Sequence, residues 1–275
     1  MNVKTAPLVD STGTPLNSLL DINRLPPAEK EAVYRSLLPE ALCAEFGIDP
    51  VTFKGREDGL RKVEIIAPRG LGLVRIEVRR SPEEDCIFFT ELADTHYLQI
   101  ELSFFLTNDP SAPRFDIDRD AMGRSNHFGS CRRNIGEEVR ALQAGLAPHQ
   151  VRRGKGLFRP FLPRLEALAA SLGAEMIVTE ALCYANAIQY EKHGFDYVTG
   201  KALMQWIDRE FRPGGILYRR LDGTTPFRQP GMEKTVRGRS WAIHDGILDQ
   251  PWDEVILYKR IGEDAGVDSF PTKTY

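Results

Sequence analysis

Apolar residues change their spacing several times along the chain, and each change marks a different predicted element. Residues 26–46 begin with two prolines and then carry apolar side chains at helical spacing from Val33 to Phe46, interrupted at Pro39. This pattern predicts one kinked helix or two short helices. Residues 1–25 are rich in Pro, Ser, Thr, Asn and Asp, so we expect an extended or poorly ordered lead-in.

Alternating apolar residues come next and predict strands. Alternation is found in residues 63–67, 74–78 and 100–104, and another β-rich run lies near residues 86–92. Because short polar turns separate these runs, they predict an antiparallel meander. Residues 107–136 have no sustained pattern, and a loop of this length in a compact domain is often functional.

The second half predicts a strand, a glycine-containing turn, a helix and another strand. We expect the first strand at residues 137–146, the turn at 150–158, the helix up to Leu172 and the next strand at 176–178. A second helix at 184–193 should end at a C-capping Gly194, with a strand from Phe195 onward. Residues 201–251 are rich in Gly, Pro and Arg, and a final strand is expected at 253–261.

Composition limits the function classes. A chain of 275 residues, 42% of them hydrophobic, is long enough for one large domain or one and a half. Lys and Arg number 36 against 39 Asp and Glu, so there is no global basic field and we expect no nucleic-acid partner. No apolar run approaches membrane-spanning length, and the N-terminus lacks the hydrophobic core of a signal peptide. We therefore expect a cytoplasmic protein with no membrane partner.

Cysteine and histidine spacing gives no sign of a metal site. The four cysteines contain no CxxC pair, which favours reduced packing thiols over a zinc cluster or a disulfide framework; they are Cys43, Cys86, Cys131 and Cys183. Four of the histidines have no partner at ligand spacing; they are His96, His127, His193 and His244. We expect no metal cofactor.

Cationic side chains gather around the glycine turn. Between Val139 and Leu165 the chain has six Lys or Arg residues and no acidic one, although its formal net charge is −3. Glycines allow close backbone approach, and a following helix directs amide groups at an anion. The turn therefore predicts a phosphate-binding site, with these candidate residues: Arg152, Arg153, Gly154, Lys155, Gly156, Leu157 and Phe158.

Two separated motifs together resemble those of a known family. RGKGLF at Arg153 to Phe158 resembles the pyrophosphate loop of the GNAT N-acyltransferase superfamily, and NAIQYEKHGF at Asn186 to Phe195 resembles its later helix, often NxxxYxxxGF. The resemblance covers residues 137–200. It implies an α+β fold with a central mixed, mostly antiparallel twisted sheet flanked by helices.

The resemblance also implies a division of the chain. We expect an N-terminal, partly helical extension at residues 1–59, an acyltransferase core at 60–200, and a C-terminal insert with the last core strand at 201–275. The expected reaction transfers an acyl group, in the first place from acetyl-CoA, to an amine of a small molecule or a protein. Donors with longer chains, on CoA or acyl carrier protein, and a non-catalytic acyl-CoA sensor are the alternatives. A homodimer is a further expectation.

Site roles follow from the same resemblance. Backbone groups near Leu146, on the strand expected before the turn, would pair with the pantetheine arm of coenzyme A, and Asn186 would hydrogen-bond it. Tyr190 would protonate the leaving thiolate, or else it packs in the core. A general base is sought among Glu138, which shares a strand face with Leu142 and Leu146, and Glu180, which alternatively binds the substrate amine.

The turn departs from the family pattern at three positions. Phe158 stands where the family usually has Gly or Ala, and Pro160 and Pro163 fall in the first turns of the helix. Because proline has no N–H, we expect a helix that begins late or is distorted, with fewer amides facing the phosphate.

Overall fold

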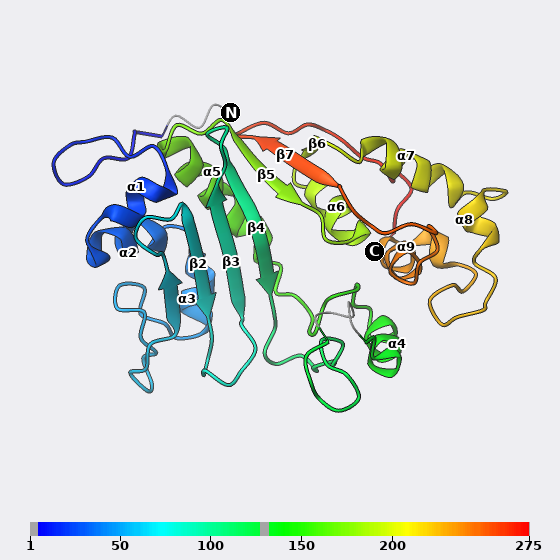
Figure 1. The fold of residues 1–275 in the computed structure, drawn as a ribbon. Coiled ribbons are helices and arrows are strands. Elements are labelled where there is room, and N and C mark those ends of the chain that lie inside the picture. The colour runs from blue at the N-terminus through cyan, green and yellow to red at the C-terminus, as the bar shows by residue number, and fades with distance from the viewer. Residues whose placement is uncertain (1–4, 127–131, 275) are drawn as a thin grey trace. The chain divides into compact units, whose positions relative to one another are not determined.

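The computed structural model describes residues 5–126 and 132–274, and it has a mixed α+β fold (Figure 1). Within these residues, seven strands form one mixed sheet in the order β1-β2-β3-β4-β5-β7-β6. The coarse expectation of a mixed sheet accompanied by helices is confirmed.

Two compact units divide the chain between them. The first unit contains Met1–Pro110, Gly154–Thr179 and Tyr258–Asp264, and the second contains Ser111–Arg153, Glu180–Leu257 and Ala265–Tyr275. The expected division at 1–59, 60–200 and 201–275 describes the extent of an acyltransferase core and not compact units. It stays a prediction. The candidate turn starts where the chain enters the first unit, at Gly154.

Four strands of the first unit form the expected antiparallel meander (Figure 1). They are β1 (Val63–Ile66), β2 (Leu73–Val78), β3 (Phe88–Asp94) and β4 (Ile100–Thr107). Alternate residues of β2 are fully buried, as period 2 requires: Val74, Ile76 and Val78 are 0% exposed. The prediction for this region is confirmed.

Short helices precede the meander. Residues 26–46 form two helices, α2 (Pro27–Arg35) and α3 (Glu40–Glu45), so the second of the two expected arrangements is confirmed. Pro39 is the N-cap of α3, where its missing N–H costs no helical hydrogen bond.

The expectation of an extended or poorly ordered lead-in is wrong at residues 19–24, whereas residues 5–17 contain no helix. A further helix, α1 (Leu19–Arg24), buries Leu19 and Ile22 completely. The Asn23 side-chain amide donates to the carbonyls of Leu71 and Leu73 at 2.7 and 2.8 Å, which fixes α1 beside β2. The sequence did not predict α1 because the helix is less than two turns long, and so short a helix shows no repeated apolar spacing.

The helix α5 (Phe158–Ser171) begins at Phe158 despite its prolines, so the expected late start is wrong. Its first residues pack into an aromatic core. The Phe158 ring lies 5.0 Å from that of Phe105 on β4, and the Phe161 ring lies 5.6 Å from that of Phe88 on β3. Aromatic burial on this scale stabilises the helix more than the loss of one hydrogen bond at Pro163 destabilises it.

The strand expected at residues 137–146 is wrong, because this segment forms the helix α4 (Ile135–Gln143). Glu138 and Ala141, three residues apart, are the buried positions, and Val139 and Leu142 are partly buried. Asn134 caps the helix by accepting from the Glu137 amide. The apolar pattern did not predict this helix because one of its two buried residues, Glu138, is charged.

The rest of the second unit is mainly helical. The helix at 184–193 is confirmed as α6 (Tyr184–Glu191), and Gly194 follows it with a positive φ of 83°. Helices also occupy much of the segment 201–251, for which no elements were predicted; they are α7 (Lys201–Glu210), α8 (Ile216–Arg219), the 3-10 turn η1 (Met232–Lys234) and α9 (Val236–His244). The remaining strands are β5 (Met176–Glu180), β6 (Asp196–Tyr197) and β7 (Ile256–Arg260), all near their predicted positions.

Candidate functional site

The glycine turn lies against the end of β4 in the first unit. The Lys155 amide donates to the Thr107 hydroxyl oxygen at 3.3 Å. Gly156 has a φ of 68°, which favours glycine, and no heavy atom lies within 4 Å of the place where a Cβ would be. Gly156 is therefore required by backbone conformation, and the space beside it is open to a ligand.

The Lys155 ammonium group is already paired. Its Nζ lies 2.6 Å from a carboxylate oxygen of Glu45 and 3.9 Å from one of Asp109, and 5.4 Å from the centre of the Phe46 ring. Only 15% of the side chain is exposed. A bound phosphate would have to compete with these carboxylates for the ammonium group.

The first turn of α5 offers few amide donors to an anion. Leu157 is buried and occupies the N-cap position, and its carbonyl accepts from the Phe161 amide at 3.1 Å. Pro160 has no N–H, so the amides of Phe158 and Arg159 are what the first turn can present. The Phe158 side chain is 8% exposed, and its place in the aromatic core explains why a large residue stands where the family has Gly or Ala.

The strand that precedes the turn is β4 and not residues 137–146. β4 and β5 are parallel neighbours, paired through Ile100 with Ile177 and Glu101 with Val178. Within the described chain, β4 has no strand partner on that side from Ser103 to Thr107. The expected unit is therefore wrong in its first strand. In chain order, β4 is followed by residues 108–153, which contain α4, and then by Gly154, α5 and β5.

Leu146 lies after α4 in the second unit, so the expectation that it belongs to a strand is wrong. Its carbonyl accepts from Trp241 Nε1 at 2.8 Å, and its amide donates to the Ala141 carbonyl at 3.0 Å. Both backbone groups already have hydrogen-bond partners. Leu146 was assigned to pantetheine because a strand was expected there, and that strand is absent. In the same unit the Arg152 guanidinium donates to the Ala112 carbonyl, and Arg153 is exposed.

Asn186 and Tyr190 both lie on α6. The Cys183 thiol donates to the Asn186 side-chain oxygen at 3.1 Å in the first turn of the helix. Tyr190 is 9% exposed, and its ring lies 5.2 Å from that of Phe195. The ring therefore packs in the core, while the role of the hydroxyl in catalysis stays a prediction.

The two candidate bases have opposite surroundings. Glu138 is 2% exposed and paired with Arg133 at 2.5 Å and with His244 at 3.4 Å. Burial alone would raise the pKa of Glu138, but hydrogen bonds from His244 and Arg133 hold it below its usual value. Such a carboxylate is a weak base, and the strand face on which its choice rested is absent. Glu180 ends β5 and is exposed.

Glu138 belongs to an ionic cluster that sequence reasoning missed. Arg133 also binds Asp245 at 2.9 Å, and Asp245 accepts from Arg228 at 3.0 Å. The His149 ring lies edge-on to that of His244 at 5.0 Å, and burial lowers the pKa of His149 to about 4. Because Arg133 and Asp245 are 112 residues apart, no local pattern signals their pairing.

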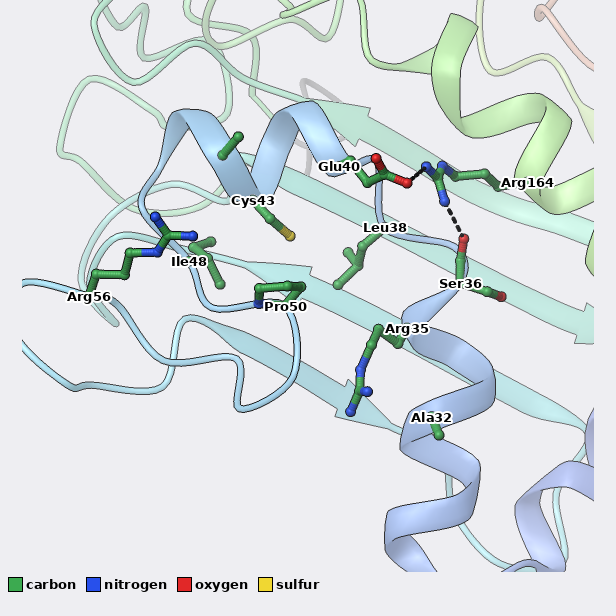
Figure 2. Close-up of a pocket in the computed structure, with 11 residues that line it drawn as sticks. Ala32, Arg35, Ser36, Leu38, Glu40, Cys43, Ile48, Pro50, Arg56 and Arg164 are labelled. Atoms are coloured by element: carbon green, nitrogen blue, oxygen red, sulfur yellow. Dashed lines mark hydrogen bonds and ion pairs between the residues drawn. The ribbon is translucent and has the colours of Figure 1, made fainter.

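A pocket of about 420 Å³ lies elsewhere in the first unit (Figure 2). Residues of α2 and α3, the loop after α3, and Arg164 of α5 line it. None of the site residues predicted from the sequence is among them. The motifs could not have revealed it, because its cationic residues are far apart in the chain.

Comparison of the chain with protein-family models, with curated proteins and with solved structures gives no match. No helix in the described residues is long and apolar enough to cross a membrane. Over the same residues, no group of three or more His, Cys, Asp or Glu side chains is arranged to hold a metal ion. Cys131 and His127 lie outside the described residues.

Proposed function

We propose that this protein is an acyl-CoA-dependent N-acyltransferase of the GNAT type, which transfers an acetyl group to a primary amine. The observation that carries the proposal is the parallel pair β4 and β5, joined through the glycine turn and α5, with the turn bonded to Thr107 at the end of β4. The sheet order and the motif of α6 are compatible with the same family.

Coenzyme A would bind along the first unit. An extended pantetheine arm carries amides that can pair with the backbone of β4 between Ser103 and Thr107, which has no strand partner on that side within the described residues. The pyrophosphate would lie at the turn from Gly154 to Phe158. With Lys155 paired and Pro160 lacking an N–H, the exposed Arg159 contributes positive charge there.

The reaction requires two proton transfers and no redox step. The amine nitrogen attacks the thioester carbonyl carbon, the carbon–sulfur bond breaks, the nitrogen loses a proton to a base, and the thiolate receives a proton from an acid. We assign the acid to the Tyr190 hydroxyl. Glu180 is the preferred base because its carboxylate is exposed, whereas that of Glu138 is held by Arg133 and His244.

The test is release of free CoA thiol from acetyl-CoA by the purified full chain supplied with a set of amines. Tyr190→Phe should slow release at least tenfold, because the removed hydroxyl protonates the thiolate and general acid catalysis contributes about 10²–10⁴-fold. Tyr218→Phe, on a partly exposed tyrosine of α8, is the matched control and should leave the rate unchanged.

Binding of CoA is tested separately. Gly156→Asp places a carboxylate at the turn and should weaken CoA binding strongly. Gly173→Asp is its control, because Gly173 at the other end of α5 has a similar φ of 78° and the same open surroundings. Tight CoA binding without thiol release would favour the sensor, release only from acyl carrier protein would change the donor, and failure to bind either donor would refute the proposal.

A further inference from the structure

The pocket of the first unit combines apolar walls with an excess of guanidinium groups (Figure 2). Its apolar surface comes mainly from Leu38, Cys43, Ile48 and Pro50, and in Figure 2 Leu38, Cys43 and Pro50 point toward one another. Its volume of about 420 Å³ is in the range of small-molecule sites. The walls favour the apolar part of a ligand.

Three arginines line this pocket against a single carboxylate. They are Arg35, Arg56 and Arg164, and the carboxylate is that of Glu40. Arg164 binds Glu40 at 3.1 Å, but the Glu40 side chain is 92% exposed, so the pair is weak and an anion can replace it. Burial raises the pKa of the Cys43 thiol, which therefore adds no negative charge.

Arg35 has an unsatisfied donor at this pocket. Its Nη2 donates to the Val51 carbonyl at 3.0 Å, and its guanidinium lies 5.3 Å from the centre of the Phe53 ring, so the group is held in place. Its Nε is buried and has no hydrogen-bond partner. Because Nε has almost no accessible surface, Arg35 contributes its positive charge to the pocket and not a hydrogen bond from this nitrogen.

Asp49 does not neutralise the cluster. Its carboxylate is influenced by Arg56, but one of its oxygens already accepts from the backbone amides of Val51 and Thr52. Asp49 is not among the residues that line the pocket. Asp49 therefore offsets part of the charge of Arg56 from outside the pocket, while the pocket itself keeps three guanidinium groups against one carboxylate.

We propose that this pocket binds an amphiphilic organic anion, with a carboxylate or phosphate head group held by either Arg56 or Arg164, which lie on different sides of the pocket in Figure 2, and an apolar body on the side chains of Leu38 and Ile48. Guanidinium groups match both head groups, because each presents two oxygens in one plane to a pair of N–H donors. The proposal is independent of the acyltransferase assignment, because no residue of the glycine turn lines the pocket.

Calorimetric titration of the full chain with four probes tests the ligand class. Octyl phosphate and octanoate carry both features, inorganic phosphate lacks the apolar body, and 1-octanol lacks the charge. We expect at least one of the two amphiphiles to bind, and to bind at least tenfold more tightly than inorganic phosphate and 1-octanol. The tighter of the two amphiphiles identifies the head group.

Variants tie binding to the pocket. Arg56→Gln or Arg164→Gln, whichever removes the arginine that holds the head group, should weaken binding of the tighter amphiphile about tenfold by loss of a charged hydrogen bond. Arg80→Gln, which breaks a comparably exposed ion pair with Glu84 outside the pocket, should not. Ala44→Phe should block the pocket, and Ala41→Phe on the same helix is its control, because both alanines are exposed and Ala44 alone lines the pocket.

Four results would overturn the proposal. In the first, neither amphiphile binds. In the second, Ala44→Phe and Ala41→Phe alter binding equally. In the third, 1-octanol binds as tightly as the amphiphiles, and in the fourth, inorganic phosphate binds as tightly as the amphiphiles. The first two reject the site, the third rejects the need for charge, and the fourth rejects the apolar part.

Discussion

Ionic side chains are arranged differently in the two compact units. In the first unit the ion pairs lie mostly near solvent, as in Arg75 with Glu91, where the side chains are 43% and 23% exposed; Lys259 with Glu166 is a buried exception. In the second unit Arg239 and Asp208 pair at 3.0 Å with side chains only 4% and 8% exposed. The second unit therefore includes ion pairs inside its core, whereas those of the first lie near solvent apart from that exception.

This difference has a thermodynamic consequence. A surface pair contributes about 0–1 kcal/mol, because water solvates both charges in its absence. Removing one member of a buried pair leaves the other desolvated and typically costs about 3–5 kcal/mol. Substitutions of arginine should thus have unequal effects in the two units, and acid should affect the second unit more.

The largest effect is expected at Arg239. Its guanidinium binds Asp208, donates to the Glu233 carbonyl at 2.7 Å and lies 3.4 Å from the centre of the Phe270 ring. Arg239→Met should lower the free energy of unfolding by about 3–5 kcal/mol, measured by urea denaturation. Arg75→Met in the first unit should lower it by less than about 1 kcal/mol.

A double variant separates charge from packing. If the cost of Arg239→Met comes from the buried Asp208 carboxylate, which then keeps only the more exposed Arg212 as a partner, adding Asp208→Leu should restore part of the lost stability. Equal losses for Arg239→Met and Arg75→Met would contradict the comparison between the units.

The next effect is a dependence of stability on pH. Burial, with a smaller contribution from the neighbouring His244, lowers the pKa of His149 to about 4, although Glu138 acts in the opposite direction. Because the unfolded chain binds a proton at this histidine near pH 6.5 and the folded chain does so only near 4, stability falls as the pH decreases between these values. The full loss from this residue is up to about 3 kcal/mol.

His149→Asn isolates that contribution, since asparagine tolerates the positive φ of 68° at this position. Unfolding free energies measured from pH 7 to 4 should fall less steeply in the variant than in the unaltered protein. His96→Asn, on an exposed histidine of the first unit, is the control and should keep the original slope. Matching slopes in all three proteins would show that His149 is not held neutral by the fold.

The same contrast explains which elements could be predicted from the sequence. The strands β1, β2 and β4 were predictable because apolar and polar residues alternate in them, and β3 because of its β-rich composition, and both signals are local. The helix α4 was mistaken for a strand because its buried face includes Glu138, whose partners Arg133 and His244 complete the burial. A charged residue can be predicted to lie in a core only when the residues that pair with it are known.

In the candidate site, too, local features were predictable from the sequence and long-range contacts were not. RGKGLF located the glycine turn and the apolar face predicted the helix α5, because both are local features, although the late start expected from its prolines was wrong. The pairing of Lys155 with Glu45 and the engagement of Leu146 by Trp241 depend on residues 110 and 95 positions away. Such contacts determine which groups are accessible to a ligand, and the spacing of residues in the sequence does not predict them.

The smallest expected effect concerns the segment that looked least structured. The Ser18 hydroxyl oxygen accepts from the Asp21 amide at 3.0 Å and caps α1, and the carboxylate of Asp94 accepts from the Leu19 and Leu20 amides at 2.9 Å. Ser18→Ala should therefore lower the unfolding free energy by about 1 kcal/mol, whereas Ser18→Asp should preserve stability because aspartate is an equally good cap.

The control is Ser36→Ala, because the Ser36 hydroxyl donates to the Val33 carbonyl at the exposed end of α2 and caps no amide. Thermal unfolding of the three variants distinguishes an ordered α1 from a lead-in that contributes nothing. If Ser18→Ala and Ser36→Ala melt together with the unaltered protein, α1 is not part of the cooperative first unit. A loss confined to Ser18→Ala would show that its few buried residues anchor this segment to the sheet.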